Sequence, residues 1–271
     1  MKNWLQAMGL LAILTLSATP LSAQWPDYPT RNVPRTPDGE PDLNGPVPRT
    51  SWGTVDLSGI WARQSGGGND EEDANAIPQA TFFDIGANLE GGTPYTPWAE
   101  ELRAERMAND MRDNPDAHCL PIGHMQLHLH PQPRRMVQTE DLLVIIYESN
   151  YGLREIFLDG RPAPDNNPIP WWYGYSRGWW EGDTLVVETT HFRDGGWLDV
   201  NGSPLTGEGT ITERFTRTEF GHLEIVVTVD DPKAYTEPFT VQVDQEIMVD
   251  TALIEFICNE NERSSEYFDQ D

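Results

Sequence analysis

Residues 210–231, TITERFTRTEFGHLEIVVTVDD, decide the fold class. The stretch holds two runs rich in Ile, Val, Thr and Phe, separated by FGH at residues 220–222 and closed by DDP at 230–232. β-Branched and aromatic residues favour strands, and a glycine between two such runs is typical of a hairpin. We therefore expect two adjacent antiparallel strands here.

Similar runs continue on both sides of this hairpin. They are RRMVQTED, LLVIIYES, YGLREIFLDG, YGYSRGWWEG, DTLVVETTHF, EPFTVQVDQEIMV and TALIEFICN, between residues 134 and 259. Eight or nine antiparallel strands in roughly 125 residues predict an up-and-down barrel or a sandwich, and closure into a barrel removes exposed edges. The expected fold is mainly β, an up-and-down barrel with one peripheral helix.

The chain before the strands divides into three parts. Residues 1–23 have the charged start, short apolar core and small closing residues of a signal peptide. Residues 24–56 are rich in Pro, Gly, Asp and Arg without apolar periodicity and predict an extended arm. Residues 57–271 are then a single barrel domain with a loop-and-helix insertion at about 64–133. Within it, TPWAEELRAERMANDMRDNP predicts a helix over residues 97–112 with Thr96 as N-cap.

Charge and cysteine content restrict the function. The formal net charge is −26, which disfavours nucleic acid and anionic membrane surfaces as partners. No segment after the signal peptide predicts membrane insertion. We expect a periplasmic or secreted protein, in which Cys119 and Cys258, the two cysteines of the chain, pair as a disulfide.

Several motifs carry a family resemblance. They are DLSGIW (56–61), CLPIG (119–123), RPAP (161–164), GWWEGDTLVVETT (178–190), RF (214–215) and VTVDDP (227–232). In this order they resemble a widespread group of exported bacterial proteins. The G-x-W at Gly59–Trp61 separately resembles the opening strand of lipocalin and calycin barrels, which implies a cavity for a small organic ligand and no particular reaction. The histidines discussed next lie outside the shared motifs.

GHMQLHLHP, residues 123–131, contains three histidines that alternate with Met and Leu. We interpret it as an amphipathic strand, in which His128 and His130 share a face about 6.6 Å apart. Such a pair can bind a divalent metal such as Zn²⁺, with His191 as third ligand and His124 peripheral. The alternative is a solvated strand face. No dinucleotide fingerprint or phosphate loop occurs, so we expect no nucleotide cofactor.

Aromatic and charged residues supply the remaining candidates. Tryptophans and tyrosines are dense between residues 171 and 197, and charges interrupt several strand runs. Predicted ligand-binding residues are Trp172, Tyr173, Trp179, Arg154 and Arg217; predicted catalytic residues are His191, Asp194 and Glu188. We expect an exported barrel enzyme, a lyase, hydrolase or isomerase, that acts on a small oxygenated or aromatic compound by metal-assisted or histidine-based acid–base chemistry. The alternative is a non-catalytic, lipocalin-like binding protein.

Overall fold

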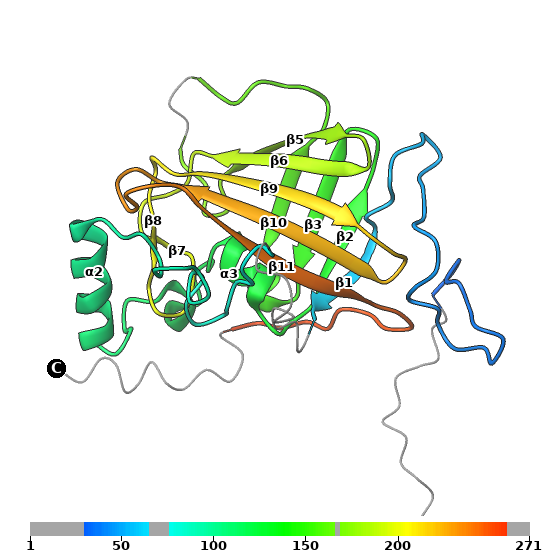
Figure 1. Cartoon of the computed structure of the whole chain (residues 1–271), viewed down its shortest axis with the longest axis horizontal. Coiled ribbons are helices and arrows are strands. Elements are labelled where there is room, and N and C mark those ends of the chain that lie inside the picture. The colour runs from blue at the N-terminus through cyan, green and yellow to red at the C-terminus, as the bar shows by residue number, and fades with distance from the viewer. Residues whose placement is uncertain (1–29, 65–75, 166–168, 259–271) are drawn as a thin grey trace, which may run out of the picture.

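A computed structural model describes residues 30–64, 76–165 and 169–258 (Figure 1). The predicted signal peptide lies outside these residues. Nine strands close into a barrel, in the order β1-β11-β10-β9-β6-β5-β4-β3-β2. They are β1 (Gly59–Arg63), β2 (Arg134–Gln138), β3 (Leu142–Tyr147), β4 (Leu153–Phe157), β5 (Tyr175–Glu181), β6 (Thr184–Thr190), β9 (Thr210–Arg217), β10 (His222–Asp230) and β11 (Phe239–Met248). The predicted closed β-barrel is confirmed.

Neighbouring strands run antiparallel everywhere except between β4 and β5. This parallel step has a geometric cause, because an odd number of strands cannot alternate in direction all the way round a closed barrel. It joins only two residue pairs, Ile156 with Ser176 and Phe157 with Arg177. The sequence analysis did not predict this short seam.

Alternation along the strands builds the core. On β10 the side chains of Leu223, Ile225, Val227 and Val229 are buried, and those between them are partly exposed. Each such apolar side chain contributes about 1.5–3 kcal/mol by leaving water. Trp61 on β1 is fully buried and donates its indole N–H to the carbonyl of Leu57 at 2.9 Å.

Helix α2 (Pro97–Ala108) lies outside the barrel wall, as predicted (Figure 1). Thr96 caps it by accepting a hydrogen bond from the backbone N–H of Ala99, and Pro97 occupies its first turn. It ends at Ala108, earlier than predicted, because Asp110 and Met111 adopt positive φ. Near it lie the short 3₁₀ helix η1 (Pro115–His118) and the two-stranded sheet of β7 (Gly196–Trp197) and β8 (Pro204–Leu205).

The predicted histidine strand is wrong, because residues His124–Leu129 form helix α3. All six of its residues are buried, and its polar side chains meet inward-facing residues of β2 and β9. An isolated strand in a barrel interior would leave its backbone N–H and C=O groups without partners, whereas a helix bonds its own backbone. The alternation of His with Met and Leu therefore reflects burial on every side, not one wet face.

The ends of the described chain lie along the barrel. Residues 30–56 form the extended arm, and the backbone N–H of Gly221 donates to the carbonyl of Leu43 at 2.7 Å. Residues 251–258 form no strand, contrary to prediction, and a second 3₁₀ helix, η2 (Ser149–Tyr151), follows β3. None of the helices in the described part of the chain has the length and apolarity of a membrane span.

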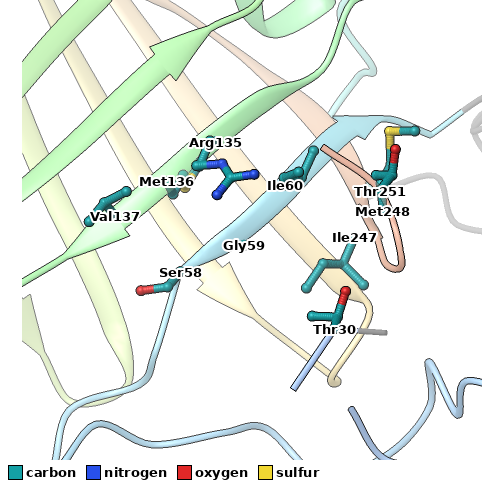
Figure 2. A pocket seen from close by; sticks show the side chains of 10 residues that line it. All are labelled: Thr30, Ser58, Gly59, Ile60, Arg135, Met136, Val137, Ile247, Met248 and Thr251. Carbon is teal, nitrogen blue, oxygen red and sulfur yellow. The ribbon is translucent and has the colours of Figure 1, made fainter. Parts of the chain in front are cut away.

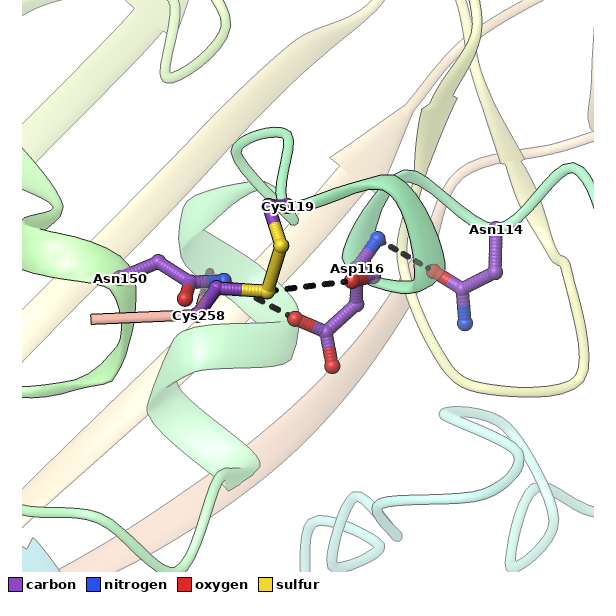
Figure 3. The surroundings of a disulfide bond; sticks show 5 residues. All are labelled: Asn114, Asp116, Cys119, Asn150 and Cys258. Atoms are coloured by element: carbon purple, nitrogen blue, oxygen red, sulfur yellow. Dashed lines mark hydrogen bonds between the residues drawn. A yellow bond between two sulfur atoms is a disulfide. The ribbon is translucent and has the colours of Figure 1, made fainter. Parts of the chain in front are cut away.

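The disulfide between Cys119 and Cys258 is confirmed and spans 139 residues (Figure 3). Asp116 lies beside it: its carbonyl is 3.9 Å from the sulfur of Cys258, and its carboxylate accepts a hydrogen bond from the amide of Asn150 at 3.0 Å. The cross-link joins the segment that leads into α3 to the chain that follows β11.

Candidate functional site

Helix α3 presents two histidines to the barrel interior from one face. His124 and His128 stand four residues apart, so their side chains are neighbours on the helix surface, with ring centroids 5.9 Å apart. Both are buried. The predicted pair of His128 and His130 is separated, because His130 follows the helix and its ring contacts Phe82.

The two partners of His128 determine its tautomer. Arg134 can only donate, so Nδ1 of His128 accepts from its guanidinium at 2.9 Å. Nε2 therefore carries the proton and donates to Oε1 of Glu213 at 2.7 Å. Burial lowers the pKa of His128 to about 4 although Glu213 opposes the shift, and the ring is neutral at pH 7.

Glu213 is the centre of a buried cluster that it forms with His124, His128, Arg134 and Arg154. It faces inward from β9 between Ile211 and Phe215. Arg154 on β4 donates to both of its carboxylate oxygens, one bond measuring 3.0 Å. Burial by itself would raise the pKa of Glu213, but Arg154 and the two histidines hold it well below its ordinary value. The carboxylate is therefore ionised.

Two hydroxyl groups complete the surroundings of Arg154. Its Nε donates to Oγ of Ser176 at 3.0 Å, and one terminal nitrogen donates to Oγ1 of Thr189 at 2.9 Å. The two hydroxyls are 3.0 Å apart and share a further hydrogen bond. Burial opposes its charge, yet the Glu213 carboxylate raises the pKa of Arg154.

Arg134 on β2 is a second buried guanidinium. Besides Nδ1 of His128, it bonds the backbone carbonyl of His128 at 3.2 Å. Because a guanidinium can only donate, the amide of Gln245 is assigned with its oxygen toward Arg134, at 2.5 Å. Burial lowers the pKa of Arg134 to about 10, so the group stays charged at neutral pH. Among the described residues no carboxylate lies within 4 Å of it.

His124 differs from His128 in having no side-chain hydrogen bond. Its ring stacks on Phe192 at 5.7 Å, and within the described part of the chain the backbone of Tyr173 is a weak hydrogen-bond partner of the ring. Nε2 is 3.6 Å from Oε2 of Glu213. Burial, followed by the charge of Arg154, lowers the pKa of His124 well below its ordinary value, so a neutral imidazole stands beside an ionised carboxylate.

Two tyrosines connect the cluster to the surface. The rings of Tyr147 and Tyr173 stack at 6.1 Å, and the ring of Tyr147 lies 6.3 Å from that of His128. The hydroxyl of Tyr147 is buried beside the Arg154 guanidinium, which can only donate to it, so its own proton has no acceptor among the described residues. Burial raises the pKa of both phenols, which are therefore protonated at neutral pH.

A groove of about 430 Å³ lies at the β4–β5 seam. Its lining is largely aromatic and includes Leu153, Phe157, Trp171, Trp172, Tyr173 and Tyr175. Arg154 and Ser176, both buried, also border it. The seam joins only two residue pairs. Arg154 and Ser176, which are hydrogen-bonded to each other, border the groove and also belong to the buried cluster.

Two other cavities carry less chemistry. One, of about 430 Å³, lies against β1, where Arg135 of β2 and Ile60 border it together with Thr30 and Thr251 (Figure 2). Arg135 is its one ionisable lining residue. The other, of about 480 Å³, lies beside Phe82 and Phe83, with Arg63 as its ionisable residue. Neither is bordered by the Glu213 cluster.

Each of the three predicted catalytic residues has a hydrogen-bond partner of its own. His191 follows β6 with φ of 59°, and its Nδ1 is 2.8 Å from Oγ1 of Thr190. Glu188 pairs with Arg177 at 2.5 Å, and both are partly exposed. Asp194 accepts from the backbone N–H of Gly207 at 3.0 Å in a loop. These contacts give no acid–base group composed of the three.

The predicted ligand-binding residues divide into two sets. Arg154, Trp172 and Tyr173 border the groove. Trp179 is exposed and donates its indole N–H to Glu181 at 3.0 Å. Arg217 stacks over Trp61 at 4.9 Å and donates to the carbonyls of Phe220 and Asp56, which anchors the arm.

The predicted metal set of His128, His130 and His191 gains no support from these contacts. Both ring nitrogens of His128 are engaged with Arg134 and Glu213. Across residues 30–64, 76–165 and 169–258, no three His, Cys, Asp or Glu side chains are arranged to hold a metal ion. Zn²⁺ binding stays a prediction.

Sequence reasoning missed Glu213 and Arg134, and treated His124 as peripheral. Strand alternation contained a signal for Glu213, since Ile211, Glu213 and Phe215 share a face of the run TITERF. A carboxylate on an otherwise apolar strand face indicates a buried charge that requires a partner. Nothing in the local sequence placed Arg134 or Tyr147 beside α3, because that contact depends on barrel closure.

No protein-family model, no curated protein and no solved structure matches the chain.

Proposed function

We propose that the protein binds a small aromatic or oxygenated compound in the β4–β5 groove and acts on it by acid–base chemistry that involves His124 and Glu213. The reaction classes that fit are those of a lyase, an isomerase or a hydrolase. We further propose export to the periplasm or the exterior, which the disulfide and the resemblance to exported bacterial proteins support.

The carrying observation is His124. A buried imidazole that is hydrogen-bonded to no side chain, 3.6 Å from an ionised carboxylate, can accept a proton from a bound compound. Glu213 then stabilises the imidazolium, while Arg154 holds the carboxylate in place. Tyr173 borders the groove, and its backbone is a hydrogen-bond partner of the His124 ring, so this residue links the groove to His124.

A non-catalytic binding function is the second candidate. It is favoured by the hydrogen bonds that Glu213 accepts from Arg154 and His128, because such a paired network can serve only to stabilise the fold. In that case the groove alone carries the function, and His124 contributes packing.

Both candidates require ligand binding in the groove. Purified protein is titrated with phenol, benzyl alcohol and benzoate by isothermal titration calorimetry. Trp172→Ala should weaken binding at least about fivefold, because an aromatic stacking partner contributes about 1 kcal/mol or more. Trp179→Ala, which removes an exposed tryptophan outside the groove, is the matched control. Equal affinities for both variants would contradict the groove as the binding site.

Turnover separates the two candidates. The same protein is incubated with a mixture of small aromatic esters, alcohols and hydroxy acids, and the products are followed by NMR. An enzyme loses at least about 100-fold in rate with His124→Gln while binding persists, as expected for a removed general base. His118→Gln, at an exposed histidine, is the control. Binding without turnover in the unchanged protein would leave the binding function.

A further inference from the structure

The buried cluster carries an excess of one positive charge. Arg134, His128, Glu213 and Arg154 form a continuous hydrogen-bonded chain, and all four are at most 1% exposed. Two guanidinium groups stand against one carboxylate. Protonation of either histidine of α3 would only increase the excess. Within the described residues no second carboxylate lies within 4 Å of either guanidinium.

An uncompensated charge in a protein interior is costly, of the order of several kcal/mol even after relaxation. Proteins retain such a charge at sites where a ligand supplies the counter-charge. The excess here is a single charge, which matches a monoanion such as a carboxylate better than a dianionic phosphate.

Unused hydrogen-bond donors accompany the charge. In the described part of the chain, Nε of Arg134 is buried without a partner, and the proton of the buried Tyr147 hydroxyl has no acceptor, since Arg154 can only donate to that hydroxyl. The nitrogens of His124 are buried and bonded to no side chain. A neutral imidazole offers one donor and one acceptor, whereas the guanidinium nitrogen and the phenol both offer a proton. The unsatisfied capacity of the cluster is therefore mainly for donation to an acceptor.

Two hydroxyl groups beside Arg154 also have a proton left to donate. Ser176 and Thr189 each accept a hydrogen bond from Arg154 and share one bond between them. Each hydroxyl has one proton, and the shared bond uses one of the two, so one proton is left to donate. When Thr189 donates the shared bond, the free proton belongs to Ser176, which borders the groove and can donate to a ligand oxygen there. Glu155, at the same groove, would repel an anion, but it alternates with the inward-facing Arg154 and is exposed.

We infer that the ligand of the β4–β5 groove is an aromatic carboxylate, whose ring lies against the aromatic lining and whose carboxylate approaches Arg154, the guanidinium that borders the groove, and so compensates the positive excess of the cluster. The inference rests on the proposed function for the groove itself and adds the charge of the compound. Ser176, which borders the groove, and Tyr147, which lies beside Arg154 and stacks on Tyr173 of the lining, supply hydrogen bonds to the carboxylate.

Benzoate and benzamide test this inference, because they have nearly the same shape and differ in charge. Isothermal titration calorimetry at pH 7.5 should give at least about tenfold tighter binding of benzoate, since hydrogen bonds to a charged group contribute about 1.5–3 kcal/mol. Tyr147→Phe removes one hydroxyl and keeps the ring. It should reduce the benzoate preference at least about threefold, because the hydrogen bond that it removes is stronger to a charged carboxylate oxygen than to the amide oxygen of benzamide.

Tyr235→Phe is the matched control, since its hydroxyl is buried against the carbonyl of Pro204, outside the cluster. Circular dichroism checks that each variant is folded, and Ser176→Ala replaces Tyr147→Phe if the latter does not fold. Equal binding of benzoate and benzamide would overturn the carboxylate and leave the groove function standing. Binding of neither compound would overturn both. A benzoate preference that is unchanged in both Tyr147→Phe and Ser176→Ala would place the carboxylate elsewhere and so refute the inference.

Discussion

Glu213 is the buried carboxylate that pairs with the charged and polar side chains inside the barrel. It is the one acidic partner of Arg154 among the described residues, and it accepts a hydrogen bond from Nε2 of His128. Paired buried charges are often close to neutral for stability, but a buried charge whose partner has been removed is strongly unfavourable. The role of Glu213 is therefore visible mainly when it is lost.

Glu213→Gln should lower the free energy of unfolding by about 3–5 kcal/mol, because it leaves two buried guanidinium groups without a counter-charge. Urea denaturation measures the change. Glu188→Gln is the control: its pair with Arg177 is one-third exposed, and such pairs contribute at most about 1 kcal/mol. Comparable losses of unfolding free energy in the two variants would show that Glu213 does not compensate buried charge.

His128 makes stability depend on pH in a defined direction. Its pKa is about 4 in the folded protein and near the ordinary 6.5 when unfolded. Between these values the unfolded chain binds a proton that the folded protein does not. Stability is therefore fully present above about pH 6.5 and is lost as the pH falls toward 4, by about 3 kcal/mol from this group. The lowered pKa of His124 acts in the same direction.

His128→Gln tests this dependence, since glutamine can donate to Glu213 and accept from Arg134 but does not titrate. The slope of unfolding free energy against pH, measured by urea denaturation from pH 7 to 4.5, should become shallower. His118→Gln, at an exposed histidine, is the control variant and should reproduce the original slope. An unchanged slope in His128→Gln would mean that the ring is already charged, or accessible to water, in the folded protein.

The sequence pattern of a segment predicted its secondary structure wherever that segment has one buried and one solvent-exposed face. The hairpin of β9 and β10 lies between core and solvent, and its alternation predicted both strands. Helix α3 has no solvent side, so alternation of His with Met and Leu carried no information about its conformation. The β4–β5 seam was equally hidden, because a parallel step follows from the number of strands in the closed barrel and not from any local residue. The cluster around Glu213 depends on both features, which is why Arg154, Tyr173 and His128 were predicted as site residues but their assembly around Glu213 was not, and His128 was predicted with another role.

The start of α3 depends on a backbone conformation that favours glycine. Gly123 has φ of 78° and ψ of 149°, a region that residues with a Cβ avoid, and an added Cβ would lie 3.3 Å from the carbonyl oxygen of Trp197. Gly123→Ala should therefore cost about 1–3 kcal/mol of unfolding free energy in urea denaturation.

Gly39→Ala is the comparison for this variant. Gly39 also has positive φ, 89°, but an added Cβ would meet nothing within 4 Å, and the residue lies in the arm. It should cost less than Gly123→Ala and leave ligand affinity unchanged. Gly123→Ala should weaken benzoate binding as well, because α3 carries His124 and His128 into the cluster. If both variants behave alike, the position of α3 does not depend on Gly123.

Across the whole molecule, barrel closure and the disulfide constrain different parts of the chain. Closure joins β11 to β1 and uses residues up to Met248, whereas the cross-link lies beyond it, at Cys258. Between them the backbone N–H of Ile254 donates to Glu148 at 2.9 Å, and residues 251–258 form no strand. The barrel is thus complete before the chain reaches the disulfide.

Removing the disulfide should therefore weaken the protein without unfolding it. A loop of 139 residues corresponds to about 5 kcal/mol in the chain-entropy model. In the double variant Cys119→Ser, Cys258→Ser the segment after β11 can also loosen in the folded state, which offsets part of that entropy. We expect a loss of about 2–4 kcal/mol in urea denaturation, with the circular dichroism of the barrel retained. Thiol titration of the unreduced, denatured original protein should find no free thiol, and a titre of two per chain would contradict the bridge. Complete unfolding of the double variant would instead show that residues after Met248 hold the barrel closed, against the strand pairing of β11 with β1.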